Sequence, residues 1–320
     1  MNGTDWYLAL LAGFALDLLF GDPAWRYHPV CLIGRYIAWC EKRLRFRGGD
    51  LRKSAVLLTA STVAVTMTAS AALIALASLG GRWPCLAVMA LLNWMGLSAR
   101  CLAKEAEGVR QALARGVEAG RMQVARIVGR DTGELNEREI IAATVETVSE
   151  NTTDGVVAPM LYGFLGGPVL LWGFKAASTL DSMVGYMDPK YRDIGWSSAR
   201  LDDILNYIPA RLTGPLMCLS AGLCRLNIRG AWRMLRRDHA CHQSPNCAWT
   251  EAAAAGALGI RLGGTHQYFG KTVVKPAIGD DTRPIQRQDI RRVNRMMYIT
   301  ALLTMALLGV LMLAIGGIAG

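Results

Sequence analysis

Three carboxylates recur at a spacing of four residues in the middle of the chain, at Glu146, Glu150 and Asp154. A helix would place them on one face, where like charges at this spacing repel each other. Water can solvate such a face, or a cation can stabilise it. Magnesium usually takes one or two protein carboxylates together with substrate phosphates. The spacing alone leaves two hypotheses open: a metal site and a solvated helix face.

A second group of chemical interest is Lys175, Asp181 and Ser182, which stand inside a largely apolar stretch. Ionisable side chains at membrane depth are costly and are functional by default. The alternative is that Lys175 and Asp181 satisfy each other's charge. Both interpretations stay open from the sequence.

Adjacent carboxylates at Asp202 and Asp203 follow Arg200 and precede an apolar run. Carboxylates in this position can cap a helix, and they can also bind a metal ion. Capping is the simpler interpretation for Asp202.

A fourth group combines His242, Asn246 and Glu251 with Arg261, which is followed by Leu-Gly-Gly. Glycines let backbone amides approach an anion, and arginine offers a fork for phosphate or carboxylate. The chain contains no P-loop, no G-x-G-x-x-G and no G-x-S-x-G in the expected strand–turn–helix context.

The cluster His239, Cys241, His242 and Cys247 does not have the spacing of a structural zinc site. None of the eight cysteines forms a C-x-x-C pair. We therefore expect reduced thiols rather than a metal centre there.

The elements that must position these groups are membrane helices. Of the 320 residues, 52% are hydrophobic and 19% are charged, whereas soluble domains carry about a quarter charged residues. About 20 apolar residues span a bilayer as a helix. The predicted spans are 6–21, 54–79, 84–103 and 296–319, and the further membrane-embedded or re-entrant segments are 155–186 and 205–225.

Segment 155–186 is interrupted by Gly166, Gly167 and Pro168. Broken backbone at membrane depth needs protein or water to shield it. We expect this segment to enter the membrane, turn back and line a cavity.

The net charge of +10 is concentrated beside the predicted spans. This positive-inside pattern places the segments 26–53, 104–154, 187–204 and 226–295 in the cytoplasm and both termini outside. Anionic lipid explains the charge better than nucleic acid does. No basic residue precedes Arg26, so we expect no signal peptide.

Outside the spans, Asn136 and Glu139 predict a capping box at the start of a helix. Basic and Ala-rich helices are expected within 229–242 and 249–258, and an irregular Gly-rich segment within 261–281. The predicted fold is a single domain over 1–320, an all-α polytopic membrane protein with about four to six membrane-embedded helical segments and cytoplasm-facing helices and loops.

The same residues resemble the CobD/CbiB family, adenosylcobinamide-phosphate synthase of cobalamin biosynthesis. The most specific motif is Ser-Glu-Asn-Thr-Thr-Asp-Gly at 149–155. The resemblance covers almost the whole chain. Its other motifs include Gly-Asp-Pro at 21–23, His-Pro-Val at 28–30, Val-Gly-Arg-Asp at 128–131, Thr-Leu-Asp-Ser-Met-Val-Gly-Tyr at 179–186, Ala-Arg-Leu-Asp-Asp at 199–203, His-Gln-Ser-Pro-Asn at 242–246 and Arg-Leu-Gly-Gly at 261–264.

The resemblance implies an ATP-dependent ligase that joins aminopropanol, or its phosphate, to the carboxylate of adenosylcobyric acid. ATP and Mg²⁺ are the implied cosubstrate and metal. The product would be adenosylcobinamide or its phosphate, made at the cytoplasmic side of the inner membrane. The sequence does not decide between the free and the phosphorylated amine.

The resemblance also suggests roles for individual residues. The catalytic candidates are Glu150, Asp154, Lys175, Asp181 and His242. The candidates for binding substrate or nucleotide are His28, Arg35, Asn151, Thr152, Ser182, Arg200, Asn246, Glu251 and Arg261. The metal candidates are Glu150, Asp154, Asp181, Asp202 and Asp203.

Two other functions remain open at this stage, a corrinoid-binding transporter and an AmpE-like regulatory membrane protein. Transporters usually contain paired repeats, and none is evident here. The expected partners are the lipid bilayer, the two substrates, other late cobalamin-assembly enzymes and a second copy of the chain, but not nucleic acid.

Overall fold

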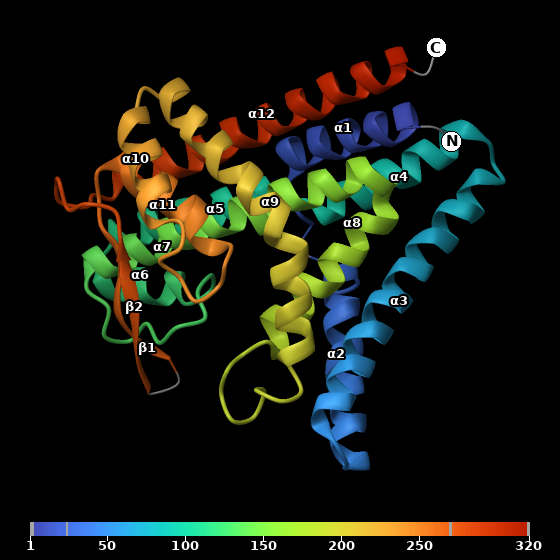
Figure 1. Cartoon of the computed structure of the whole chain (residues 1–320), viewed down its shortest axis with the longest axis horizontal. Helices are drawn as coiled ribbons and strands as arrows, with labels where there is room; N and C mark the ends of the chain where they lie inside the picture. The colour runs from blue at the N-terminus through green and yellow to red at the C-terminus, as the bar shows by residue number, and fades with distance from the viewer. Residues whose placement is uncertain (1–2, 24, 269–270, 319–320) are drawn as a thin grey trace. The chain divides into compact units, whose positions relative to one another are not determined.

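The computed structural model describes residues 3–23, 25–268 and 271–318, and it is helical there apart from one hairpin (Figure 1). Its elements are α1 (Gly3–Phe20), α2 (Pro29–Arg47), α3 (Leu51–Ser78), α4 (Arg82–Gly96), α5 (Ala99–Leu113), α6 (Val117–Val124), α7 (Glu137–Thr152), the π-helical segment η1 (Thr153–Val157), α8 (Ala158–Val184), α9 (Trp196–Leu223), α10 (Ile228–Asp238), α11 (Cys247–Leu258), β1 (Leu262–Tyr268), β2 (Lys271–Ile278) and α12 (Gln288–Ile318).

Five helical stretches among the described residues are long and apolar enough to cross a membrane. They are Gly3–Phe20, Leu51–Ser78, Arg82–Leu113, Glu137–Val184 and Gln288–Ala314. The prediction of an all-α polytopic membrane protein with four to six embedded segments is therefore confirmed. Each of the four predicted spans overlaps one of these helices, and Glu137–Val184 contains most of segment 155–186. Helix α9, which contains most of segment 205–225, is not among the five.

Helix α8 is interrupted where the sequence predicted a break. Gly166 (φ −149°, ψ 25°) and Gly167 (φ 63°, ψ −163°) leave the helical conformation, and Pro168 follows them. The positive φ of Gly167 is accessible to glycine but strained for other residues. Pro168 cannot donate a backbone hydrogen bond. Three consecutive residues thus account for the break in α8.

The chain divides into two compact units. Unit 1 comprises Met1–Ser98, Ala158–Asn206 and Met305–Gly320, and unit 2 comprises Ala99–Val157 and Tyr207–Thr304.

In unit 1, helix α8 packs against α1, α2, α3 and α4. Its core includes Ile37 from α2, Leu58 from α3 and Leu171 from α8, all almost completely buried. The indole Nε1 of Trp172 donates a hydrogen bond to the carbonyl of Leu92 at 3.1 Å. This bond satisfies the polar atom of a large side chain inside an otherwise apolar helical core.

In unit 2, α7 packs against α5 and α6, and α11 contacts both α7 and α10 (Figure 1). Helices α10 and α11 meet backbone to backbone at Gly230 and Gly256. A Cβ atom at Gly256 would lie 2.3 Å from the carbonyl oxygen of Gly230, closer than any real Cβ contact. Only glycine fits at this crossing, which holds α11 tightly against α10.

The prediction of an irregular segment over 261–281 was wrong. Strands β1 and β2 form an antiparallel hairpin with an irregularity between Leu262 and Gly264. The adjacent glycines of β1 and Pro276 in β2 are unfavourable in strands, and they hide the hairpin in the sequence.

Candidate functional site

Helix α7 carries two of the three regularly spaced carboxylates. It begins at the predicted capping box: Asn136 Oδ1 accepts from Glu139 N at 3.1 Å, and Glu139 Oε2 accepts from Asn136 N at 2.8 Å. The cap fixes where the helix starts, and Glu146 and Glu150 follow one turn apart. Asp154 lies beyond the α-helical part, in η1. Single π-helical turns inside α-helices are frequent at functional sites.

Glu146 is buried and both of its oxygens are used. Its Oε2 lies 2.6 Å from Nη2 of the buried Arg130, and its Oε1 accepts from the amide of Gly263 at 2.8 Å. One carboxylate therefore ties the loop before α7 and strand β1 to α7.

Glu251 on α11 is also buried. Burial raises the pKa of Glu251 well above its usual range, and the charges of Glu146 and Glu150 raise it further, against the opposing effect of Lys275 and Arg130. Its neutral, hydrogen-bond-donating form is favoured.

Glu150 is the partly exposed member of these three glutamates. The Sγ–H of Cys247 donates to Glu150 Oε1 at 3.1 Å. Burial raises the pKa of Cys247 well above that of a free thiol, and the neighbouring charges of Glu150, Glu251 and Asp154 add to this effect. Cys247 is consequently a thiol donor that holds one oxygen of Glu150.

His242 precedes α11 in a turn, and its Nδ1 accepts a hydrogen bond from the backbone amide of Ser244 at 3.0 Å. Burial lowers the pKa of His242, as does Lys275, while Glu150 and Glu146 act in the opposite direction. The neutral ring is favoured. Because Nδ1 is an acceptor, the proton of this neutral ring lies on Nε2, which can donate to an anion.

Asn246 is buried at the start of α11, and its Oδ1 accepts from Arg211 Nη1 at 3.3 Å. The Arg211 guanidinium lies over the ring of Tyr207, 3.3 Å from its centroid, and 5.0 Å from that of Trp249. These contacts fix a cation beside the turn that carries His242. Arg261, by contrast, is exposed.

Seven residues of unit 2 thus form what we call the glutamate cluster. They are Arg130, Glu146, Glu150, His242, Cys247, Glu251 and Lys275.

Two polar residues beside Glu150 bond to their own helix. Asn151 Nδ2 donates to the carbonyl of Thr147 at 2.9 Å, and Thr152 Oγ1 donates to that of Val148 at 2.7 Å. The hydroxyl of the next residue, Thr153, is buried without a hydrogen-bond partner among the described residues. Roles of Asn151 and Thr152 in binding stay predictions.

In unit 1, His28 caps α2, and its Nδ1 accepts from the amide of Val30 at 3.3 Å. Its Nε2 lies 2.8 Å from Asp22 Oδ1. Arg35 Nη2 donates to the carbonyl of Arg26 at 2.5 Å. The His-Pro and Gly-Asp-Pro motifs are thereby joined in one turn.

The other predicted residues of unit 1 lie on two helices. Lys175, Asp181 and Ser182 are on α8, where Ser182 Oγ donates to the carbonyl of Thr179 at 2.9 Å. Arg200, Asp202 and Asp203 are on α9, and Asp202 Oδ2 accepts from Asn206 Nδ2 at 3.0 Å. Catalytic, binding and metal roles for these residues stay predictions.

A test of the metal hypothesis is the arrangement of ligand side chains. Among the described residues, no group of three or more His, Cys, Asp and Glu is arranged to hold a metal ion. Glu146 is already engaged by Arg130 and Gly263, and Glu251 favours its protonated form. Glu150 and Asp154 are carboxylates of the kind that magnesium takes when phosphate and water supply its remaining ligands, so the metal role of these two residues stays a prediction.

Sequence reasoning assigned no role to Arg130, Cys247 or Lys275. Arg130 is part of the Val-Gly-Arg-Asp motif, and this motif was the one feature of the sequence that pointed to a role for Arg130. Cys247 was expected to be a reduced thiol, and Lys275 lay in the segment predicted to be irregular. All eight cysteines are free in the structure.

Comparison with known proteins shows which family the chain resembles. A model of the family described as CobD/Cbib protein matches residues 10–297. The chain is 48% identical over 296 residues to cobalamin biosynthesis protein CobD of Geobacter metallireducens, covering 92% of this chain and 93% of that protein. It is 46% identical over 293 residues to CobD of Listeria monocytogenes (91% and 93% covered) and 43% identical over 319 residues to cobalamin biosynthesis protein CbiB of Salmonella typhimurium (98% and 99% covered). No solved structure matches the chain.

Proposed function

The chain belongs to the CobD/CbiB family of cobalamin biosynthesis proteins, and we propose that it catalyses an ATP-dependent amide ligation. The amine of aminopropanol, or of its phosphate ester, is joined to the carboxylate of adenosylcobyric acid. The product is adenosylcobinamide or its phosphate.

The chemistry makes defined demands on the protein. A carboxylate is a poor electrophile, and an ammonium ion is not a nucleophile. Bound Mg·ATP would supply a phosphoryl group that converts one carboxylate oxygen into a leaving group, with ADP and phosphate as products. The protein must stabilise negative charge and accept the proton that the amine loses.

The glutamate cluster is the observation that carries the proposal. Glu150 is partly exposed, and its Oε1 is held by the Cys247 thiol. We assign it the role of base for the attacking amine. Glu146 on α7 and Glu251 on α11 are both buried, so neither of them offers a second exposed carboxylate beside Glu150.

Cationic and hydrogen-bond-donating groups beside Glu150 suit an anionic substrate. The Nε2–H of neutral His242 donates to a phosphate or carboxylate oxygen, and Lys275 adds a positive charge. Together with Arg211, these groups bind the carboxylate that is to be activated. Asp154 would hold the magnesium ion, which neutralises phosphate charge when it is bound, and Glu150 is then available as the base.

The protein is a multi-pass membrane protein. We further propose that it resides in the inner membrane with the glutamate cluster facing the cytoplasm. The charge distribution supports this, because basic segments flank the candidate spans.

A direct test uses the purified full chain in detergent, supplied with ATP, Mg²⁺, adenosylcobyric acid and either aminopropanol or its phosphate. Mass spectrometry should detect the amide and an equal amount of ADP. Glu150→Gln should lower the rate by at least about 10² because it removes the base. The matched control is Glu134→Gln, an exposed carboxylate in the loop before α7, which should retain activity.

The proposed ligation is overturned if neither amine gives an amide while the protein still binds the corrinoid. The assignment of Glu150 as the base is overturned separately by full activity of Glu150→Gln.

A further inference from the structure

Helix α10 presents two chemically different faces. Gly230, Ala231, Met234 and Leu235 are buried, and the helix packs against α11. The remaining face carries the arginines and the one tryptophan of the helix. It forms an open hollow of about 730 Å³ lined by Ile228, Arg229, Trp232, Arg233, Arg236 and Arg237, which we call the α10 surface.

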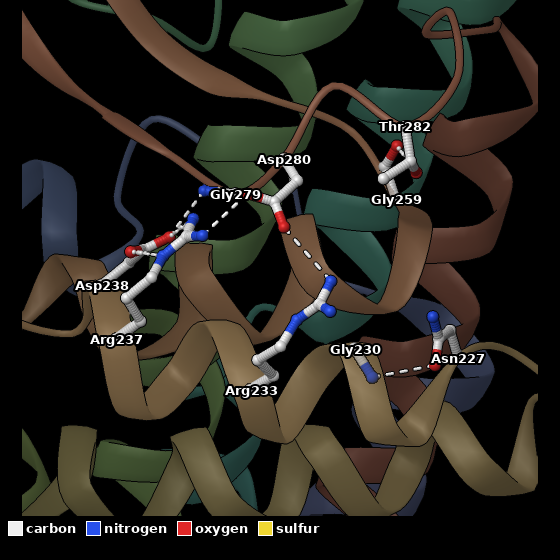
Figure 2. Close-up of polar contacts among 9 residues, drawn as sticks. All are labelled: Asn227, Gly230, Arg233, Arg237, Asp238, Gly259, Gly279, Asp280 and Thr282. Atoms are coloured by element: carbon white, nitrogen blue, oxygen red, sulfur yellow. Dashed lines mark hydrogen bonds and ion pairs between the residues drawn. The ribbon is translucent and has the colours of Figure 1, made fainter.

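Two of its arginines are held by carboxylates (Figure 2). Arg237 donates to both oxygens of Asp238, at 2.6 and 2.9 Å, and to Asp280 Oδ1 at 2.7 Å. Arg233 donates to Asp280 Oδ2 at 3.1 Å. The amide of Gly279 also donates to Asp238, at 2.8 Å. The loop after β2 is thereby locked to the end of α10.

The other two arginines keep their charge available. Arg229 and Arg236 are exposed, and within the described part of the chain neither forms an ion pair. Four arginines against Asp238 and Asp280 leave a net charge of 4 − 2 = +2. A surface with two uncompensated guanidinium groups around a tryptophan suits an anion with an apolar neighbour.

A short segment of the chain connects this surface to a candidate membrane helix. Asp280, which binds Arg233 and Arg237, precedes the first residue of α12 by 288 − 280 = 8 residues. A chain of that length spans at most about 28 Å. The candidate membrane-spanning helix Gln288–Ala314 starts at that point, and its uncharged part begins at Met296. Tryptophan and arginine together are typical of the interface between a membrane and water.

We propose that the α10 surface binds the phosphate groups of anionic phospholipids. A soluble nucleotide fits less well, because nucleotide phosphates are usually cradled by backbone amides at a glycine-rich turn or helix start. At the start of α10 the amide of Gly230 is already bonded to Asn227 Oδ1 at 2.8 Å (Figure 2). The open hollow offers side-chain guanidinium groups instead.

The test is lipid titration of the purified full chain in neutral detergent, followed by native mass spectrometry. The probes are phosphatidylglycerol and phosphatidylcholine, with ATP and inorganic phosphate as competitors. Arg229→Gln and Arg236→Gln should each weaken phosphatidylglycerol binding about fivefold, and the double variant about 25-fold. Phosphatidylcholine binding should not change.

The matched control is Arg115→Gln, which removes another exposed arginine of unit 2 and should bind phosphatidylglycerol like the wild type. The double Arg→Lys variant keeps the charge and should retain binding, which separates loss of charge from misfolding. Equal binding by the double Gln variant and the wild type would overturn the proposal. So would displacement of the lipid by ATP or phosphate at concentrations comparable to that of the lipid.

Discussion

Nη2 of Arg130 lies 2.6 Å from Oε2 of Glu146, and each residue is less than 10% exposed. This ion pair joins the loop before α7 to the helix that carries Glu150. Removing one partner of a buried pair leaves an uncompensated charge, which costs more than removing both.

Replacing Arg130 with Met should therefore destabilise the protein by about 3–5 kcal/mol, because the charge of Glu146 stays buried without its partner. Adding Glu146→Leu in the same chain should restore part of that loss. Denaturant unfolding in detergent measures both. If the single variant is as stable as the wild type, the pair is not formed.

Ionisation of Glu251 should lower the stability of the folded protein as the pH rises. Its folded-state pKa is raised by burial and by Glu146 and Glu150. The contribution of its protonated form is complete below the unfolded pKa of about 4.3 and is lost as the pH rises through the raised value. Unfolding temperatures measured across pH should show this loss in the wild type and a flatter profile in Glu251→Gln. Parallel profiles for both proteins would contradict it.

The contribution of Asp238 to stability should have the opposite dependence on pH. Burial opposes its ionisation, but the bonds from Arg237 and from the amide of Gly279 outweigh burial, and its pKa is lowered. Its contribution is complete above the unfolded pKa of about 3.9 and is lost as the pH falls through the lower folded value. Asp238→Asn should cost about 2 kcal/mol at neutral pH and show a weaker loss of stability in acid. A variant as stable as the wild type at neutral pH would contradict the assigned bonds.

Cys247 should resist alkylation in the folded protein. Burial and nearby carboxylates raise its pKa well above the usual value, so the reactive thiolate is scarce at pH 8. Cys31 is exposed and is the internal reference. Peptide mapping after brief iodoacetamide treatment should show Cys31 modified and Cys247 unmodified. Equal modification of the two before unfolding would contradict a raised pKa of Cys247.

Local signals made much of the helical framework predictable. Long uncharged runs identified the membrane helices, and Asn136 with Glu139 identified the start of α7. The run from Gly166 to Pro168 marked the break in α8, since these residues act on their own backbone.

The contacts of the glutamate cluster were not predictable in the same way. Arg130 reaches Glu146 across 16 positions, and Cys247 reaches Glu150 across 97. No spacing rule relates residues that far apart. The hairpin was missed because Gly263, Gly264 and Pro276 disfavour strands individually, while pairing between β1 and β2 overrides that preference. The π-helical turn at 153–157 had no signal in the hydrophobic pattern.

The glycine crossing of α10 and α11 has a mechanical consequence. Because Gly230 faces Gly256, the two backbones are in direct contact and no side chain separates them at this point. A displacement of α10 from its arginine-bearing side would therefore be transmitted directly to α11, the helix that carries Glu251. The crossing holds the two backbones at a fixed separation. A methyl group added at Gly230 or at Gly256 would force the two helices apart.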